Sequence, residues 1–196
     1  MVTTAPLSLW LYTGFLALIG IERIAELIIS KRNAAAAFAK GAIEVGQAHF
    51  KVMAAFHTAF LFACLGEAWL SGRPFPQALG WVALVGALAA QALRYWAITT
   101  LGQRWNTRII VLQEAEPVTG GPYKYLKHPN YSAVVLEMIC LPLIYGSFLT
   151  AVIFSLGNAA ILFVRIRAEE EALGSKYQAA FAGKSRFLPG GARADH

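Results

Sequence analysis

The stretch Gly120–Tyr131 reads GGPYKYLKHPNY, and it stands between two segments that are apolar enough to lie in a lipid bilayer. Its positive charges are placed among three tyrosines and a His-Pro step. A long apolar region follows, in which Glu137 is the single charge, and then a second polar cluster, RIRAEEEAL, at Arg165–Leu173. We interpret the two polar clusters as two walls of one site at a membrane surface.

The composition around these clusters is that of a membrane protein. Of the 196 residues, 57% are hydrophobic and 14% are charged, whereas about a quarter of the residues of a soluble domain are charged. The net charge of +6 is typical of basic residues collected on cytoplasmic loops. No basic patch falls in a segment that could fold as a soluble binding domain, so we expect no nucleic-acid partner.

The apolar runs predict an all-α integral membrane protein with about five transmembrane helices. Three spans come first, at Leu7–Ile29, His49–Leu70 and Ala78–Thr100. Residues Asn130–Val164 must hold two more helices, with a break at Pro142 and the Tyr-Gly-Ser step after it. Each arm would be roughly 22 to 25 Å long, which is at or just below the length of a full crossing. We expect thin spans or a tight helical hairpin buried against the other helices.

Charge on the connecting loops predicts the orientation in the membrane. Basic loops alternate with loops that carry little charge, and the basic ones are Ser30–Gln47, Leu101–His128 and Lys176–His196. The positive-inside rule then places the N-terminus outside and the C-terminus in the cytosol. The alanine run in the first basic loop predicts a short helix on the membrane surface.

Two smaller features complete the expected architecture. Thr107–Leu112, TRIIVL, alternates and is β-branched, which indicates a short strand or extended segment. Cys64 and Cys140 lie in apolar segments and are expected to be packing residues. No Cys/His spacing resembles a metal site, so no metal is expected.

Several ionisable residues fall inside the first two spans. Glu22, Arg23 and Glu26 end the first span, and His57 lies in the middle of the second. One interpretation is an interfacial helix end whose side chains reach water, with His57 as a packing residue. The other is that Glu22, Glu26 and His57 line a cavity and contact a substrate, because charges inside a span are costly unless they are paired or hydrated.

In the second polar cluster, Arg165 and Glu169 come first after the apolar arm. They are four residues apart on one helical face and nearest the membrane. An arginine there can hold a planar anion through two parallel hydrogen bonds. We therefore assign function to this pair, whereas Arg167, Glu170 and Glu171 are interpreted as solvated charges of an emerging helix.

The first cluster offers complementary chemistry. His128 can donate or accept a hydrogen bond, and Pro129 restricts the backbone beside it. The rings of Tyr123, Tyr125 and Tyr131 can attract a cation such as a sulfonium. These residue types suit a cationic, amino-acid-bearing ligand together with an anionic lipophilic one.

The motifs resemble those of the isoprenylcysteine carboxyl methyltransferase family. The resemblance lies in Gly121-Pro122-Tyr123, in Lys127-His128-Pro129-Asn130-Tyr131 after it, and in Arg165, Glu169, Glu170 and Leu173 after a hydrophobic hairpin. Tyr177 and Leu188-Pro189 fit the same pattern, which covers roughly residues 100 to 190. The beginning, Glu22 to Asn33, is similar to the smaller bacterial branch, some of whose members resemble enzymes that methylate alkylpyrones.

The resemblance implies a methyltransferase that uses S-adenosylmethionine at the cytosolic face of a bacterial inner membrane. It implies three N-terminal helices in residues 1–100 and a catalytic region in residues 101–196. Arg165 is implied to be catalytic and to face the acceptor oxygen. The residues implied to hold the cofactor are Gln113, Val118, Tyr123, His128, Pro129, Asn130, Tyr131 and Glu169.

The implied reaction is methylation of a carboxylate or acidic enol on a lipophilic small molecule or lipidated substrate that reaches the site from membrane lipid. Such an oxygen is already anionic, so the reaction needs alignment and desolvation more than a base. The short chain lacks the extra N-terminal spans of the eukaryotic enzymes, which argues against a prenylated protein as acceptor. Three alternatives are a phospholipid N-methyltransferase, an NADPH-dependent membrane reductase and a non-enzymatic transporter or scaffold.

Overall fold

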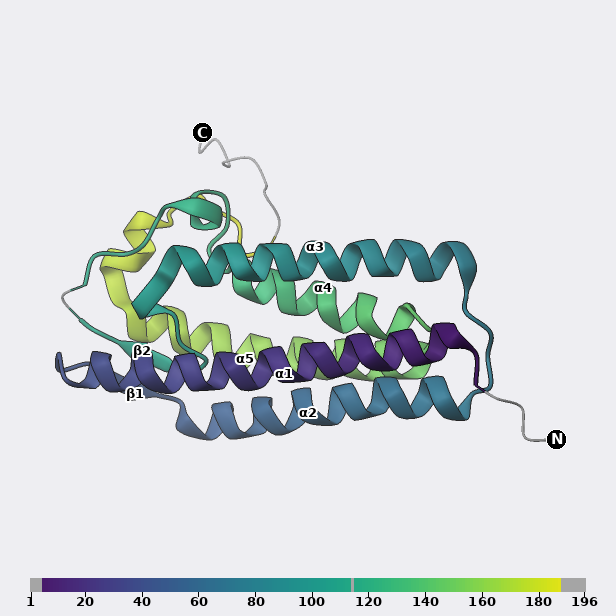
Figure 1. Ribbon diagram of the computed structural model, residues 1–196. Helices are drawn as coiled ribbons and strands as arrows, with labels where there is room; N and C mark the ends of the chain where they lie inside the picture. Colours follow the sequence, from purple (N-terminus) through teal and green to yellow (C-terminus); the bar gives the residue numbers. More distant parts are fainter. Residues whose placement is uncertain (1–4, 114, 188–196) are drawn as a thin grey trace.

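A computed structural model describes residues 5–113 and 115–187, and in them the chain forms a bundle of five long helices. The helices lie side by side along one axis (Figure 1). Their bounds are α1 Leu7–Phe38, α2 Gln47–Leu70, α3 Gln77–Leu101, α4 Pro129–Leu143 and α5 Phe148–Ala180. The prediction of five helices with a closing hairpin is therefore confirmed.

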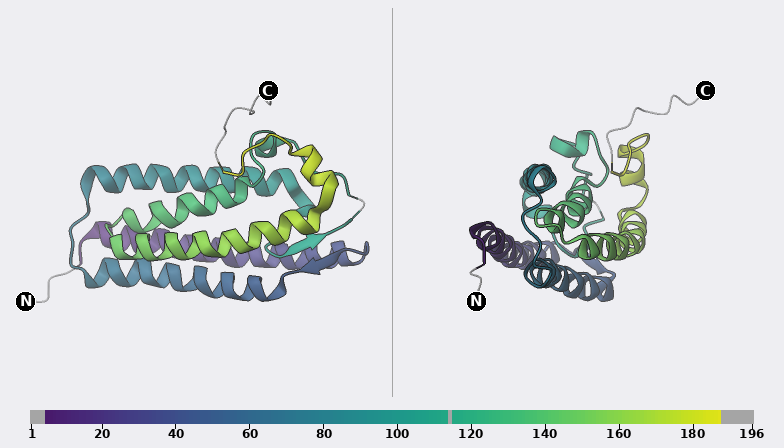
Figure 2. Two further views of the ribbon diagram at one scale, coloured as in Figure 1. Left: turned by 180° about the vertical axis from the view of Figure 1, so that it is seen from behind. Right: turned by 90° about the vertical axis from the view of Figure 1, so that its right-hand side faces the viewer.

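Length and composition support an integral membrane protein. In the described residues, three stretches are long and apolar enough to cross a bilayer, namely Phe50–Leu70, Gln77–Arg104 and Phe148–Ala180. α4 is apolar but only 15 residues long. Viewed along the bundle axis (Figure 2, right), α4 lies at its centre, so the buried hairpin expected from the sequence is confirmed for this arm. The second arm differs from that expectation, because α5 is 33 residues long and exposes Leu149, Leu156 and Phe163.

α4 can occupy the centre because small residues let α3 approach it closely. A side chain at Gly86 would have its Cβ 2.6 Å from Cys140 Sγ, and one at Gly80 would lie 2.8 Å from the carbonyl oxygen of Ile144. On the other side, Tyr12 of α1 donates a hydrogen bond to the carbonyl of Leu141 over 3.0 Å. Cys140 is thus a packing residue, as is the fully buried Cys64.

The first helix is longer than the sequence predicted. α1 was expected to end at Ile29 before a loop with a separate surface helix, but it runs without a break to Phe38. The alanine run is a strong helix former, and the chain first turns at Gly41, where φ is +82°. The prediction of a separate surface helix is wrong because no breaker stands between Ile29 and the alanines.

A small sheet closes the end of the bundle where the basic loops gather. β1, Ile43–Val45, pairs antiparallel with β2, Ile109–Val111. β2 confirms the extended segment predicted over Thr107–Leu112, whereas β1 was not predicted. Two short 3-10 turns, Gly102–Arg104 and Gly121–Lys124, shape the rest of the long loop between α3 and α4.

The basic loops expected on one membrane face do lie together. The turn after α1, the α3–α4 loop and the end of α5 all gather at the left end of the bundle in Figure 1. At the opposite end, Glu67 accepts hydrogen bonds from the backbone amides of Leu149 and Thr150 and so caps α5. The two polar clusters of the sequence therefore meet at one end of the molecule.

Candidate active site

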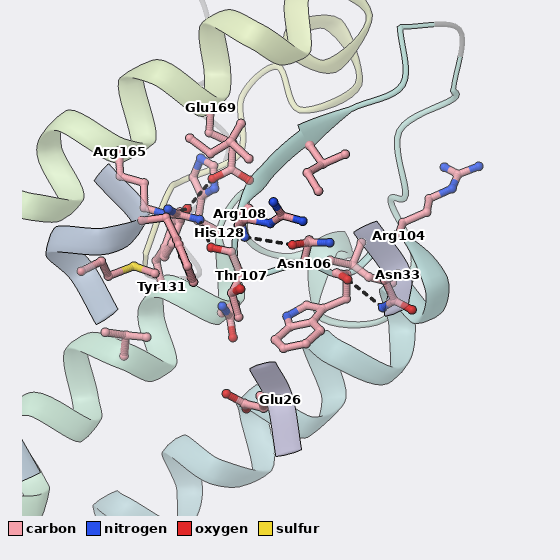
Figure 3. A pocket seen from close by; sticks show the side chains of 18 of the residues that line it. Glu26, Asn33, Arg104, Asn106, Thr107, Arg108, His128, Tyr131, Arg165 and Glu169 are labelled. Carbon is pink, nitrogen blue, oxygen red and sulfur yellow. Dashed lines mark hydrogen bonds between the residues drawn. The ribbon is translucent and has the colours of Figure 1, made fainter. Parts of the chain in front are cut away.

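Arg165 and Glu169 of α5 are joined through the hydroxyl of Tyr131 on α4. Arg165 donates from Nε to that hydroxyl over 2.8 Å, and the hydroxyl donates to Glu169 Oε2 over 2.5 Å. Both side chains project from α5 toward Tyr131 in Figure 3. The shared face predicted for Arg165 and Glu169 is confirmed, but a tyrosine from another helix stands between them.

The remaining two nitrogens of Arg165 differ in their surroundings. Nη2 donates to the backbone carbonyl of Thr107 over 2.5 Å. Nη1 is buried and has no hydrogen-bond partner among the described residues. Because Arg165 is only 4% exposed and an unpaired buried donor is costly, Nη1 is a position at which a ligand oxygen would be bound.

The loop that supplies Thr107 is held against α1. Ser30 lies within 2.7 Å of Asn106 Oδ1 and 2.8 Å of Thr107 Oγ1, and its Oγ accepts from the backbone amide of Thr107 over 3.1 Å. Asn33, one turn later, donates to the carbonyl of Trp105 over 2.8 Å. These contacts fix the Trp105–Thr107 segment beside Arg165.

His128 lies on the other side of Tyr131 and is part of a second polar chain. Its Nε2 is 3.0 Å from Glu170 Oε1, and Glu170 accepts two further hydrogen bonds from Arg186, at 2.9 and 2.6 Å. The hydrogen bond to Glu170 raises the pKa of Arg186, so the arginine stays charged. The interpretation of Glu170 as a solvated surface charge is wrong.

These contacts hold the end of the described chain over the site. The amides of Lys127 and His128 donate to the carbonyls of Ser185 and Arg186, over 2.9 and 3.2 Å. The chain can return here because α5 breaks at Gly174, which has a left-handed φ of +71°. Leu188 and Pro189, which belong to the sequence motif, lie outside the described residues.

Aromatic rings form the wall beyond His128. Tyr177 packs against Phe181 at a centroid distance of 4.5 Å and against His128 at 6.2 Å. Tyr123 belongs to the same buried cluster. Burial, and secondarily the charge of Glu169, raises the pKa of the Tyr123 phenol, so this ring stays neutral.

One cavity of about 990 Å³ connects these groups with the interior of the bundle. Its lining includes most of the residues that the sequence assigned to a site: Glu26, His57, Gln113, Val118, Tyr123, His128, Asn130, Tyr131, Arg165 and Glu169. Two assigned residues are not part of the lining. Pro129 is buried as the first residue of α4. Glu22 contacts Gln91 and Arg23 and is not among the lining residues.

The cavity continues between α1 and α2, and we name this part the membrane limb. It is lined by apolar and small residues of both helices: Leu16, Ala17, Gly20, Leu61, Phe62 and Leu65. The limb therefore runs from the polar end of the bundle along α2, whose stretch Phe50–Leu70 is long and apolar enough to cross a bilayer. An extended apolar chain is the kind of ligand that such a wall accommodates.

A network of buried charges stands where the membrane limb begins. Arg94 of α3 donates to Glu137 of α4 from two nitrogens, at 3.0 and 2.5 Å. Arg23 of α1 lies 3.2 Å from Glu26 and 2.9 Å from Glu22, and Gln91 of α3 donates to Glu22. Glu26 is 6% exposed, so the interpretation of it as an interfacial residue reaching water is wrong.

Sequence reasoning missed several members of the site. Glu137 was noticed only as an isolated charge, although an intramembrane carboxylate is itself a signal of a buried partner. No sequence pattern pointed to Arg186 or to the carbonyl of Thr107. An isolated arginine is common in any basic tail, and every residue has a backbone carbonyl. Their roles depend on how distant segments fold together.

Comparison with known proteins agrees with this geometry. The isoprenylcysteine carboxyl methyltransferase (ICMT) family model matches residues 81–175, which run from α3 to the polar end of α5. A Bacillus subtilis (strain 168) protein described as "Uncharacterized protein YpbQ" is 40% identical over 159 residues, covering 81% of this chain and 94% of that protein. A Haemophilus influenzae protein described as "Uncharacterized protein" is 32% identical over 152 residues, covering 77% and 88%.

Proposed function

Because the chain belongs to the isoprenylcysteine carboxyl methyltransferase family, a family of membrane methyltransferases, we propose that it transfers a methyl group from S-adenosylmethionine to an oxygen of a lipophilic acceptor. The acceptor oxygen is a carboxylate or an acidic enol. The observation that carries this proposal is the unpaired, buried Nη1 of Arg165 at the junction of the polar site and the membrane limb.

The residues at the polar end suit a cationic amino-acid ligand. Asn130 Oδ1 is buried without a hydrogen-bond partner among the described residues, and it lines the cavity with Glu169. Both groups are acceptors, which is what an ammonium group requires. The neutral rings of Tyr123 and Tyr177 present faces that attract positive charge.

When bound, S-adenosylmethionine supplies an electrophilic methyl group on a positively charged sulfur. The methyl group would pass to a lone pair of the acceptor oxygen, and the sulfur would keep the electrons of its former bond to carbon and leave as the neutral thioether of S-adenosylhomocysteine. An oxygen that arrives as an anion needs no general base, so the chain has only to orient it and exclude water.

Arg165 is placed to orient that oxygen. Hydrogen bonds to Tyr131 and to the carbonyl of Thr107 involve two of its three nitrogens, Nε and Nη2. These two bonds fix the orientation of the planar guanidinium and therefore the position of Nη1. A guanidinium fixed in this way attracts an anion and would repel the ammonium group of an amine acceptor. The geometry therefore favours O-methylation over phospholipid N-methylation.

The membrane limb supports delivery of the acceptor from lipid. Its apolar lining would take the tail while the anionic head reaches Arg165. We propose that this end of the bundle faces the cytosol of a bacterial inner membrane, because the basic loops gather there. If the rate of methyl transfer, as kcat/KM, did not depend on the length of the acceptor's alkyl tail, this route would be excluded.

Titration of the purified protein with S-adenosylhomocysteine tests the proposal. The wild type should bind it, Glu169→Ala should bind at least about 10-fold more weakly, and Arg165→Ala should bind within about threefold of wild type. Arg165→Ala should also lose about 100-fold or more of its turnover. Arg167→Ala, an exposed arginine of the same helix, is the control. Absence of binding to the wild type would refute a methyltransferase and favour the reductase or transporter alternatives.

A further inference from the structure

The network of buried charges at the start of the membrane limb contains polar atoms that form no hydrogen bond within the described residues. Glu26 Oε1 and Arg23 Nε are both buried, and neither has a partner in the described part of the chain. Both residues line the cavity. Figure 3 shows Glu26 on the cavity wall, away from Arg165 and Glu169.

His57 adds a third polar side chain to this part of the cavity wall. Its Nδ1 is 2.8 Å from the backbone carbonyl of Met53, so in the neutral ring Nδ1 carries the proton. Nε2 is then an acceptor, and His57 also lines the cavity.

The charges in the network are also unbalanced. Three carboxylates, Glu22, Glu26 and Glu137, face two guanidinium groups, those of Arg23 and Arg94. An extra carboxylate in a membrane interior is costly unless a hydrogen-bond donor reaches it. A network built only to tie α1 to α3 and α4 would not need a buried carboxylate oxygen without a partner among the described residues, on a residue that lines a cavity.

We propose, resting on the function proposed above, that this network is a second polar subsite for the methyl acceptor. Glu26 Oε1 and His57 Nε2 accept a hydrogen bond from the acceptor, and Arg23 Nε donates one to it. The group that fits is one that both donates and accepts, such as a secondary amide or a hydroxyl between the reacting oxygen and the apolar tail. The acceptor is thus more than an anionic head on a plain hydrocarbon chain.

The helix geometry gives the spacing of the two polar groups. Ser30 contacts the loop that bonds Arg165, and Glu26 precedes it by one turn, or about 6 Å along α1. We take this one-turn rise as the spacing to test, with the second polar group of the acceptor about 6 Å from the oxygen that receives the methyl group.

Two matched probes test this inference. One is 4-(hexadecanoylamino)butanoate, whose amide N–H lies at about that spacing from the carboxylate. The other is the ester 4-(hexadecanoyloxy)butanoate, which keeps the shape and the carbonyl but lacks the N–H. Binding of each to the full-length protein in nanodiscs with S-adenosylhomocysteine present is measured by calorimetry, so no methyl transfer is needed.

The wild type should bind the amide about 10-fold more tightly than the ester. His57→Phe and Glu26→Leu should each reduce this preference to about twofold or less. Ser155→Ala is the matched control, since Ser155 Oγ is also buried without a partner in the described chain but Ser155 is not part of the cavity lining. This control should keep the 10-fold preference.

Equal affinity for both probes, no binding of either probe, or a preference that survives His57→Phe would overturn the subsite. The proposed function is judged separately by the titration with S-adenosylhomocysteine alone. If the protein binds S-adenosylhomocysteine but has equal affinity for the two probes, the proposed function stands and the proposed subsite is refuted.

Discussion

The hydroxyl of Tyr131 accepts a hydrogen bond from Arg165 Nε over 2.8 Å, and it donates one to Glu169 over 2.5 Å. This hydroxyl therefore separates a guanidinium from a carboxylate that would otherwise attract each other. The separation keeps Arg165 available to one ligand and Glu169 to another.

Tyr131→Phe should allow Arg165 and Glu169 to pair directly. The guanidinium would turn away from the acceptor, and kcat should fall by about 10- to 100-fold. Tyr125→Phe is the control, because Tyr125 is exposed on the same loop, and it should leave kcat within about twofold. Steady-state kinetics of both variants would check this, and an unchanged kcat in Tyr131→Phe would contradict the positioning role.

Ser30→Ala should loosen the loop that holds Arg165. Three contacts to Asn106 and Thr107 would be lost, so the carbonyl of Thr107 would be less well fixed. We expect kcat to fall about 10-fold while the affinity for S-adenosylhomocysteine changes by less than about threefold. Thr99→Ala, which removes an exposed hydroxyl bonded within α3, is the comparison. A loss of cofactor affinity as large as the loss of kcat would argue against this split.

Arg186→Ala should open the end of the chain over the site. Arg186 anchors that segment through two hydrogen bonds to Glu170, which in turn contacts His128. We expect the dissociation constant for S-adenosylhomocysteine to rise about 10-fold. Arg167→Ala again serves as the control, since that side chain is exposed and its guanidinium lies over the ring of Phe163. Equal dissociation constants for the two variants would show that the closing segment does not contribute to binding.

Arg94→Ala should destabilise the bundle strongly. The pair with Glu137 is buried, with 5% and 6% of the side chains exposed, and breaking such a pair costs about 3–5 kcal/mol. The apparent melting temperature in detergent should drop by roughly 10 °C.

The double variant Arg94→Met/Glu137→Leu provides the internal control for that prediction. It removes both members of the pair and leaves Arg23 with Glu22 and Glu26, whereas Arg94→Ala also leaves the carboxylate of Glu137, so the melting temperature of the double variant should lie above that of Arg94→Ala. A double variant that is less stable than Arg94→Ala would show that the pair is needed for more than charge compensation.

Cysteine labelling checks the proposed orientation. Pro74 and Lys124 are exposed at opposite ends of the bundle, while Cys64 and Cys140 are buried and should give little background. In intact cells an impermeant maleimide should label Pro74→Cys, and Lys124→Cys should react only after the membrane is opened. The reverse pattern would mean that the site faces outward.

The number of helices and the place of the site could be read from the sequence. Apolar runs indicate spans because a bilayer requires backbone groups to bond within one helix, and the short arms around Pro142 indicated a buried hairpin. His128 and Glu169 were expected to share a site because each stands where an apolar helix meets water, and both line one cavity. The end of α1 was misplaced because a polar loop and a helix that leaves the membrane have the same composition.

Pairing between helices was decided only by the tertiary structure. Whether Glu170 is bound by Arg186, or Glu137 by Arg94, depends on how α3, α4 and α5 are rotated and on where the chain turns at Gly174. The sequence alone determined which residues are ionisable, which segments are apolar, and at which end of each helix the charges stand. Packing alone brings distant segments within hydrogen-bonding distance, and so the fold determines which of these groups are paired. In the described part of the chain it leaves one buried polar atom each of Arg165, Glu26 and Asn130 without a partner, and all three residues line one cavity.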